Sequence, residues 1–143
     1  MKMLEHWQIY ALGSAFFAGA VSILAKIGIA NIPSNLVTLI RAAIITFLLV
    51  LLVSVRREWV NPSVLDTRSL IFIVLSAVAT GLSWICYFRA LQMAPASTVA
   101  PLDKLSLAFS VFLAVLFLRE HLSGLQWGGV ILMTLGALLV GLK

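Results

Sequence analysis

Five long apolar runs dominate the sequence and restrict what the chain can fold into. They cover approximately residues 7–29, 36–55, 70–91, 98–118 and 125–142. A run of about 18 residues or more with few charges can cross the ~30 Å hydrocarbon core of a bilayer as a helix. The runs are continuous rather than alternating, and a helix satisfies its own backbone hydrogen bonds, which lipid cannot do. The sequence therefore predicts an all-α membrane protein with five transmembrane helices.

The composition excludes an ordinary soluble domain. Of the 143 residues, 62% are hydrophobic and only 10% are charged, whereas a soluble domain is roughly 25% charged. The net charge of +5 is spread along the chain, so nucleic-acid binding is not supported. The first apolar run has the length of a full span, so we interpret it as a membrane helix and not as a signal peptide. The expected surroundings are the lipid bilayer.

Several kinds of chemistry lack the residues they need. The one cysteine, Cys86, lies inside an apolar run, which predicts a small buried hydrophobe, and no spacing suits a metal site. The two histidines, His6 and His121, lie at predicted helix ends, so we expect no enzyme. No glycine-rich phosphate loop is present for a nucleotide-driven pump, and we expect no cofactor.

The charges outside the helices bear on orientation. Five spans place the N-terminus and the second and fourth loops on one side, which holds Lys2, Arg56, Arg57, Arg68 and Arg119. The positive-inside rule then predicts a cytoplasmic N-terminus in the plasma membrane of a prokaryote. The opposite side holds Lys143, together with four cations near the other helix ends. Counting those as well removes the bias, so insertion in both orientations remains open.

Five charged residues fall inside the predicted helices at a similar depth. They are Lys26, Arg41, Arg89, Asp103 and Lys104. Ionisable residues in a membrane are costly and usually face protein or a water-filled cavity. Alternate helices run in opposite directions, so these residues are expected to form one charged layer.

Helical spacing indicates which of these charges face inward. Lys26 continues a face of small residues, and Asp103 begins a stripe of serines and alanine. In the third helix, Tyr87 belongs to a polar stripe and Trp84 lies beside it. Our hypothesis is a substrate or ion pathway, with Asp103 as a proton-exchanging acid and the surplus of cations favouring an anionic or zwitterionic solute. The pathway residues are Lys26, Arg41, Trp84, Tyr87, Asp103 and Lys104.

Each charge also has an ordinary structural interpretation. Arg89 and Arg41 can extend to the interface, and Arg89 also complements a helix C-terminus. Lys26 and Asp103 can form a structural ion pair. Lys104 projects about 100° around a regular helix from Asp103, so it is expected to pair with a neighbouring subunit or to extend to the interface.

Turn and packing residues complete the pattern. Pro101 is either an ordinary helix-start proline or a kink at the mouth of the cavity. Ser123 and Gln126 have the spacing of a capping box at the start of the last helix. In that helix Gly129 and Gly136 share one face, which predicts close helix or subunit packing.

The second half of the chain resembles the drug/metabolite transporter superfamily, specifically its EamA-type domains. The resemblance rests on the order and spacing of WICYFRAL (84–91), PASTVAP (95–101), FLREHLS (117–123), QWGG (126–129) and Gly136. PLDKLS (101–106) resembles the single-repeat, five-helix branch. Arg119 departs from the glycine usual in the LGE turn of the family.

The resemblance implies one EamA-like repeat spanning 1–143. It implies a secondary transporter of a small metabolite or drug-like solute that works by alternating access. Because most members carry two inverted repeats, a lone repeat implies a homodimer, possibly antiparallel. The alternative is a lipid-linked-sugar flippase or an accessory subunit acting with a partner membrane protein.

Overall fold

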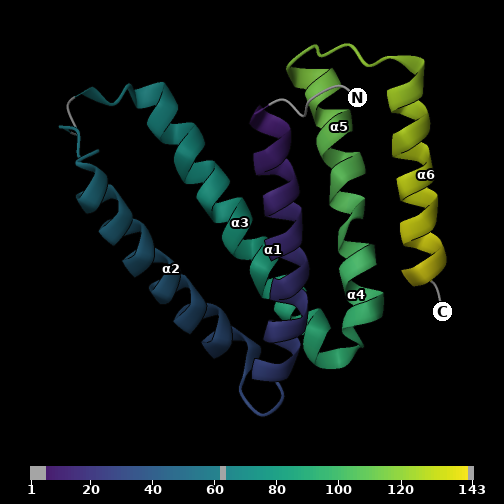
Figure 1. Ribbon diagram of the computed structural model, residues 1–143, viewed down its shortest axis with the longest axis horizontal. Coiled ribbons are helices and arrows are strands. Elements are labelled where there is room, and N and C mark those ends of the chain that lie inside the picture. Colours follow the sequence, from purple (N-terminus) through teal and green to yellow (C-terminus); the bar gives the residue numbers. More distant parts are fainter. Residues whose placement is uncertain (1–5, 62–63, 142–143) are drawn as a thin grey trace. The chain divides into compact units, whose positions relative to one another are not determined.

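In the computed structural model, which describes residues 6–61 and 64–141, the regular secondary structure of these residues consists of helices joined by turns and loops, with no strand. The helices in chain order are α1 (His6–Gly28), α2 (Ser34–Arg56), α3 (Thr67–Met93), α4 (Ala96–Asp103), α5 (Leu105–Phe117) and α6 (Gly124–Gly141) (Figure 1). Lys2, Lys143 and the predicted last helical residue, Leu142, lie outside the described residues.

The predicted count of five membrane-length helices is confirmed. α1, α2, α3 and α6 are each long and apolar enough to cross a membrane, and Ala96–Phe117 forms the remaining span. Within this last span the helix is interrupted at Lys104, because α4 ends at Asp103 and α5 begins at Leu105. On either side of the break, a backbone hydrogen bond joins residues only three positions apart: Lys104 N donates to Pro101 O and Leu107 N donates to Lys104 O, both at 3.0 Å.

Pro101 weakens the helical hydrogen bonding of this span. The proline is the sixth residue of α4, well past the first turn, so it is not a helix-start proline. It has no N–H, so it cannot donate to the carbonyl of Ser97, and its ring crowds that carbonyl. The kink interpretation is therefore the one that fits, with the helix resuming after Lys104.

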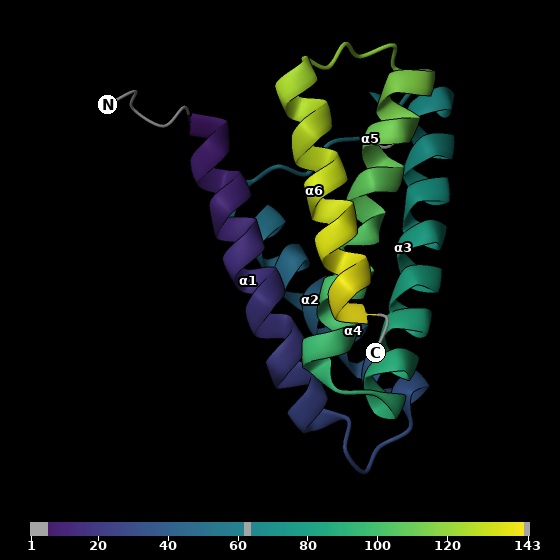
Figure 2. The same cartoon turned by 90° about the vertical axis from the view of Figure 1, so that its right-hand side faces the viewer.

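The chain forms two compact units. One contains α1, α4, α5 and α6, and the other contains α2 and α3. In the first unit α6 packs against both α4 and α5, and it runs alongside α5 in Figures 1 and 2. Gly141 permits this packing, because a Cβ there would lie 2.6 Å from Leu102 Cδ1.

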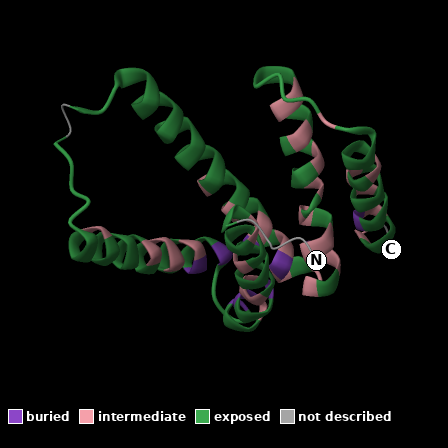
Figure 3. Cartoon of the chain, turned by 45° about the horizontal axis from the view of Figure 1, so that its top comes forward, coloured by how far each residue is buried: buried purple, intermediate pink, exposed green. Residues whose placement is uncertain are grey.

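Most side chains are exposed, as the green ribbon of Figure 3 shows. The buried hydrophobic residues are Ala25, Ile29, Val37, Phe88, Leu91, Val99 and Ala137. Cys86, predicted to be buried, is exposed. It lies on a helix of mostly exposed apolar residues, which suits a surface that contacts lipid.

Side chains satisfy the backbone at two helix starts. Asp66 Oδ2 accepts a hydrogen bond of 3.3 Å from Ser69 N at the start of α3. The predicted capping box at α6 is confirmed: Ser123 N donates to Gln126 Oε1 at 2.7 Å and Gln126 N donates to Ser123 Oγ at 3.4 Å.

Candidate functional site

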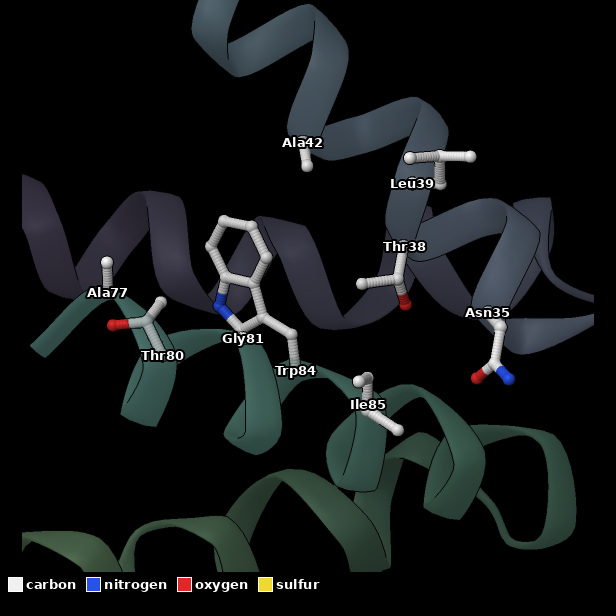
Figure 4. A pocket seen from close by; sticks show the side chains of 9 residues that line it. All are labelled: Asn35, Thr38, Leu39, Ala42, Ala77, Thr80, Gly81, Trp84 and Ile85. Carbon is white, nitrogen blue, oxygen red and sulfur yellow. The ribbon is translucent and has the colours of Figure 1, made fainter. Parts of the chain in front are cut away.

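A groove of about 630 Å³ opens between α2 and α3 (Figure 4). Its walls are mostly apolar, with a few polar groups among them. The lining residues are Asn35, Thr38, Leu39, Ala42, Ala77, Thr80, Gly81, Trp84 and Ile85. Apolar walls with a small number of polar groups are typical of small-molecule sites.

The polar groups of the groove differ in what they can offer a ligand. The hydroxyls of Thr38 and Thr80 donate to backbone carbonyls one turn earlier on their own helices, each at 2.9 Å. Their oxygens can still accept a hydrogen bond. Figure 4 shows the indole of Trp84 extending from α3 into the space facing α2, and the amide of Asn35 at one end. Trp84, a predicted pathway residue, is therefore a wall of the groove.

Arg41 lies beside this groove but is not one of its lining residues. It follows Thr38 by three positions on α2 and precedes Ala42. Its guanidinium carbon lies 4.9 Å from the ring centroid of Phe88, which is only 1% exposed. A desolvated cation–π contact of this kind is worth about 2 kcal/mol. The Arg41 Nε atom is buried and has no hydrogen-bond partner among the described residues.

The residues on either side of Phe88 make different contacts: Tyr87 packs on the Phe88 ring, and Arg89 bonds a side chain near the end of α3. Tyr87, the other predicted aromatic pathway residue, contacts Phe88 edge to face at 5.5 Å and is half-buried. Arg89 is exposed and its Nη1 donates to Gln92 Oε1 at 3.2 Å. Gln92 Nε2 in turn donates to the carbonyl of Ile32 at 2.8 Å.

Gln92 is a residue that sequence reasoning missed. Its amide connects the end of α3 to the turn before α2. The available signal was its position three residues after Arg89, where side chains on a helix meet. Arg89 therefore holds the Gln92 amide, which in turn bonds the turn before α2.

In the other unit, the structure gives Lys26 a backbone partner. Its Nζ donates to the carbonyl of Ala94 at 2.9 Å, just after α3 ends. Lys26 is half-buried, so this bond fastens the end of α1 to the segment that leads into α4.

Asp103 and Lys104 meet at the break between α4 and α5. Lys104 Nζ lies 3.6 Å from Asp103 Oδ2. The inference that Lys104 points away from Asp103 was therefore wrong. It assumed a regular helix, whereas the helix ends at Asp103 and the long lysine side chain can fold back across the turn.

A smaller cavity of about 230 Å³ lies between α5 and α6. Lys104 lines this cavity, and the other polar side chains in the cavity wall are Ser110 and Thr134. The Thr134 hydroxyl donates to Val130 O at 2.8 Å. Lys104 thus belongs both to the charged pair and to the wall of this cavity.

The predicted packing glycines lie on an open face. A Cβ placed on Gly129 or Gly136 would meet nothing within 4 Å. Within residues 6–61 and 64–141, no group of three or more His, Cys, Asp or Glu side chains is placed to hold a metal ion.

Five apolar spans with charged residues near their ends define a multi-pass helical membrane protein, and a groove lies between two of these spans. The sequence profile of the EamA-like transporter family matches residues 6–142. The chain belongs to that family, which confirms the resemblance inferred from the sequence.

Two relatives have nearly the same extent as this chain. A Sinorhizobium protein described as an uncharacterized transporter in the cobO 3' region is 44% identical over 96% of this chain and 98% of its own length. An uncharacterized protein of Methanocaldococcus jannaschii is 30% identical over 94% of this chain and 96% of its own length. No solved structure matches the chain.

The family and the transporter relative make this a membrane transporter. They favour transport over catalysis.

Proposed function

We propose that this protein is a secondary transporter that moves a small metabolite or drug-like solute by alternating access, as a homodimer in the plasma membrane of a prokaryote. The observation that carries the proposal is the groove between α2 and α3. It combines apolar walls and the indole of Trp84 on α3 with the cation of Arg41 on α2, which is next in sequence to the lining residue Ala42.

The charge of the α2–α3 unit supports an anionic or zwitterionic substrate. Neither α2 nor α3 contains an Asp or Glu, so Arg41 has no carboxylate within its own membrane helices. An intramembrane cation without a carboxylate is costly. A substrate carrying a carboxylate or phosphate would offset that cost when it enters the groove, while its apolar part contacts Trp84 and Leu39.

A second copy of the chain supplies the other half of the pathway in this proposal. The two relatives also have the length of one such repeat. Alternating access commonly uses two inverted repeats around a site near the membrane midplane. Two copies inserted in opposite orientations would provide that symmetry, and the balanced lysine and arginine distribution permits both orientations. The open glycine face of Gly129 and Gly136 offers room for close subunit packing.

Asp103 provides a route for coupling transport to protons. It lies at a break in a membrane span, where backbone groups are freed and charge is tolerated. Its carboxylate faces Lys104 at 3.6 Å. Protonation of Asp103 would release Lys104 from this pair, and that change would link proton binding to the state of the broken span.

Transport by the purified protein alone tests the proposal. The chain is reconstituted into liposomes loaded with a defined library of organic anions, zwitterions and cations of similar size, and efflux is measured by mass spectrometry. We expect selective efflux of a subset of anions or zwitterions. Efflux only when a second membrane protein is added would favour the accessory-subunit alternative, and movement of labelled lipid-linked sugar instead of soluble solutes would favour a flippase.

A further inference from the structure

Two arginines have an unusual backbone conformation at the ends of membrane helices. Among the described residues, the non-glycine residues with positive φ are Arg57, at 55°, and Arg119, at 54°. Arg57 follows directly after α2, and Arg119 follows α5 with only Leu118 between them. A left-handed conformation places Cβ close to the following carbonyl, so glycine is the usual residue at such a helix end.

The backbone of each helix end requires a left-handed residue, but not an arginine. At the end of α2, Arg57 N donates to Ser54 O at 3.2 Å and Glu58 N donates to Val53 O at 3.0 Å. This bond pair is the Schellman motif, in which glycine is preferred. At the end of α5, Glu120 N donates back to Ala114 O at 3.4 Å. The local fold therefore does not explain why both positions carry a guanidinium.

Contacts within the chain do not explain it either. Both arginines are exposed. The nearby Glu58 forms its ion pair with Arg56, at 3.8 Å. In the part of the chain that the structure describes, no side-chain hydrogen bond or ion pair is recorded for Arg57 or Arg119.

The surroundings of both arginines match the headgroup level of a bilayer. An exposed apolar side chain lies one or two positions before each arginine: Val55, 73% exposed, precedes Arg57 by two positions, and Leu118, 70% exposed, directly precedes Arg119. Trp59 is also exposed, and its Nε1 donates to Ser54 Oγ at 3.1 Å. Tryptophan is enriched at this level of the membrane.

We propose that Arg57 and Arg119 each bind the phosphate of an anionic phospholipid headgroup at the end of a membrane helix. Guanidinium forms bidentate, charge-assisted hydrogen bonds with phosphate oxygens. Bound lipid would stabilise the helix ends and offset the disfavoured backbone conformation. Glu58 and Glu120 are the acidic groups next to these sites, and with Arg56 paired to Glu58 the free charge near α2 is that of Arg57.

The test compares melting temperatures of the full chain in nanodiscs of phosphatidylcholine and of an equal mixture with phosphatidylglycerol. The variants are Arg57→Gly, Arg119→Gly and the double variant. The matched control is Arg68→Gln, which removes one exposed charge in the first turn of α3 without a left-handed residue. A third condition adds inorganic phosphate to the phosphatidylcholine nanodiscs at constant ionic strength.

We expect opposite effects in the two membranes. In phosphatidylcholine the choline cation of the same headgroup offsets the charge of the phosphate, so each glycine variant melts about 3 °C higher than the native chain because the backbone strain is relieved. In the anionic mixture the native chain and Arg68→Gln gain stability, whereas the double variant loses most of that gain. An equal gain for the double variant would overturn the proposal, as would glycine variants that melt lower in phosphatidylcholine. A gain of the same size from inorganic phosphate would overturn the assignment to lipid.

Discussion

In the unit built from α1, α4, α5 and α6, the charged side chains of Lys26 and Lys104 contact oxygen atoms of the chain, whereas in the α2–α3 unit Arg41 stacks on an aromatic ring. Lys26 reaches a backbone carbonyl and Lys104 reaches Asp103. Arg41 stacks on Phe88 and keeps a buried Nε without a hydrogen bond to the described residues. The difference indicates that Arg41, in the α2–α3 unit, is the cation most available to an anionic ligand. The groove of that unit, at about 630 Å³, is also larger than the cavity between α5 and α6, at about 230 Å³.

Replacing Arg41 should produce the largest effect on transport. Arg41→Gln removes the cation beside the groove while keeping much of the side chain. We expect efflux of the anionic substrate found in the liposome screen to fall by about 30-fold or more, the loss typical of removing one member of a buried charge contact. The measurement is initial efflux rate per reconstituted protein.

Lys26→Gln is the matched control from the other unit. It removes a cation that bonds Ala94 O, so we expect a lower melting temperature and little change in the initial efflux rate. Equal losses of efflux rate in Arg41→Gln and Lys26→Gln would contradict the contrast between the units.

Asp103→Asn should produce the next largest effect, confined to coupling. We expect accumulation driven by a proton gradient to fall about tenfold, the scale of a typical coupling free energy between two binding events, because an amide cannot exchange a proton. Downhill exchange of the same solute should persist. The measurement is uptake with and without an imposed pH gradient, with Glu120→Gln as the control acid outside the spans. Full gradient-driven accumulation in Asp103→Asn would remove the proton role.

Glycine substitutions in α6 should produce the smallest effects, and these are effects on stability. They distinguish a glycine that packs against α4 in the same unit from a glycine on an open face of the helix. Gly141→Ala should cost about 1 kcal/mol, because its Cβ would lie 2.6 Å from Leu102 Cδ1. Gly136→Ala meets nothing within 4 Å and should leave monomer stability unchanged or slightly raised. Thermal unfolding in a neutral detergent measures both. A loss for Gly136→Ala as large as for Gly141→Ala would show an internal contact at Gly136.

The spans were predictable from sequence because their length and hydrophobicity are properties of continuous segments. The capping box at Ser123 was also predictable, since it depends on two residues of fixed spacing. The partners of the charged residues were not. Arg41 meets a ring 47 positions later in the chain and Lys26 a carbonyl 68 positions later, so these contacts depend on tertiary structure.

The break in the fourth span lay between these cases. Pro101 was visible in the sequence, and a kink was one of its two interpretations. Which one applies depends on where the helix begins, and α4 begins at Ala96, early enough to place the proline inside it. The glycine usual at the position of Arg119 is likewise explained by a left-handed φ of 54° that the sequence alone did not reveal.

The central claim, a pathway formed by two oppositely inserted copies, is tested most directly by cysteine accessibility in intact cells. Single cysteines are placed at the N-terminus, in the loop between α2 and α3 and at the C-terminus, in a Cys86→Ala background that removes the exposed native thiol. The account predicts that each site is labelled from both sides of the membrane, in separate molecules. Labelling of every molecule from one side only would contradict it and would require a parallel dimer or an oppositely oriented partner chain.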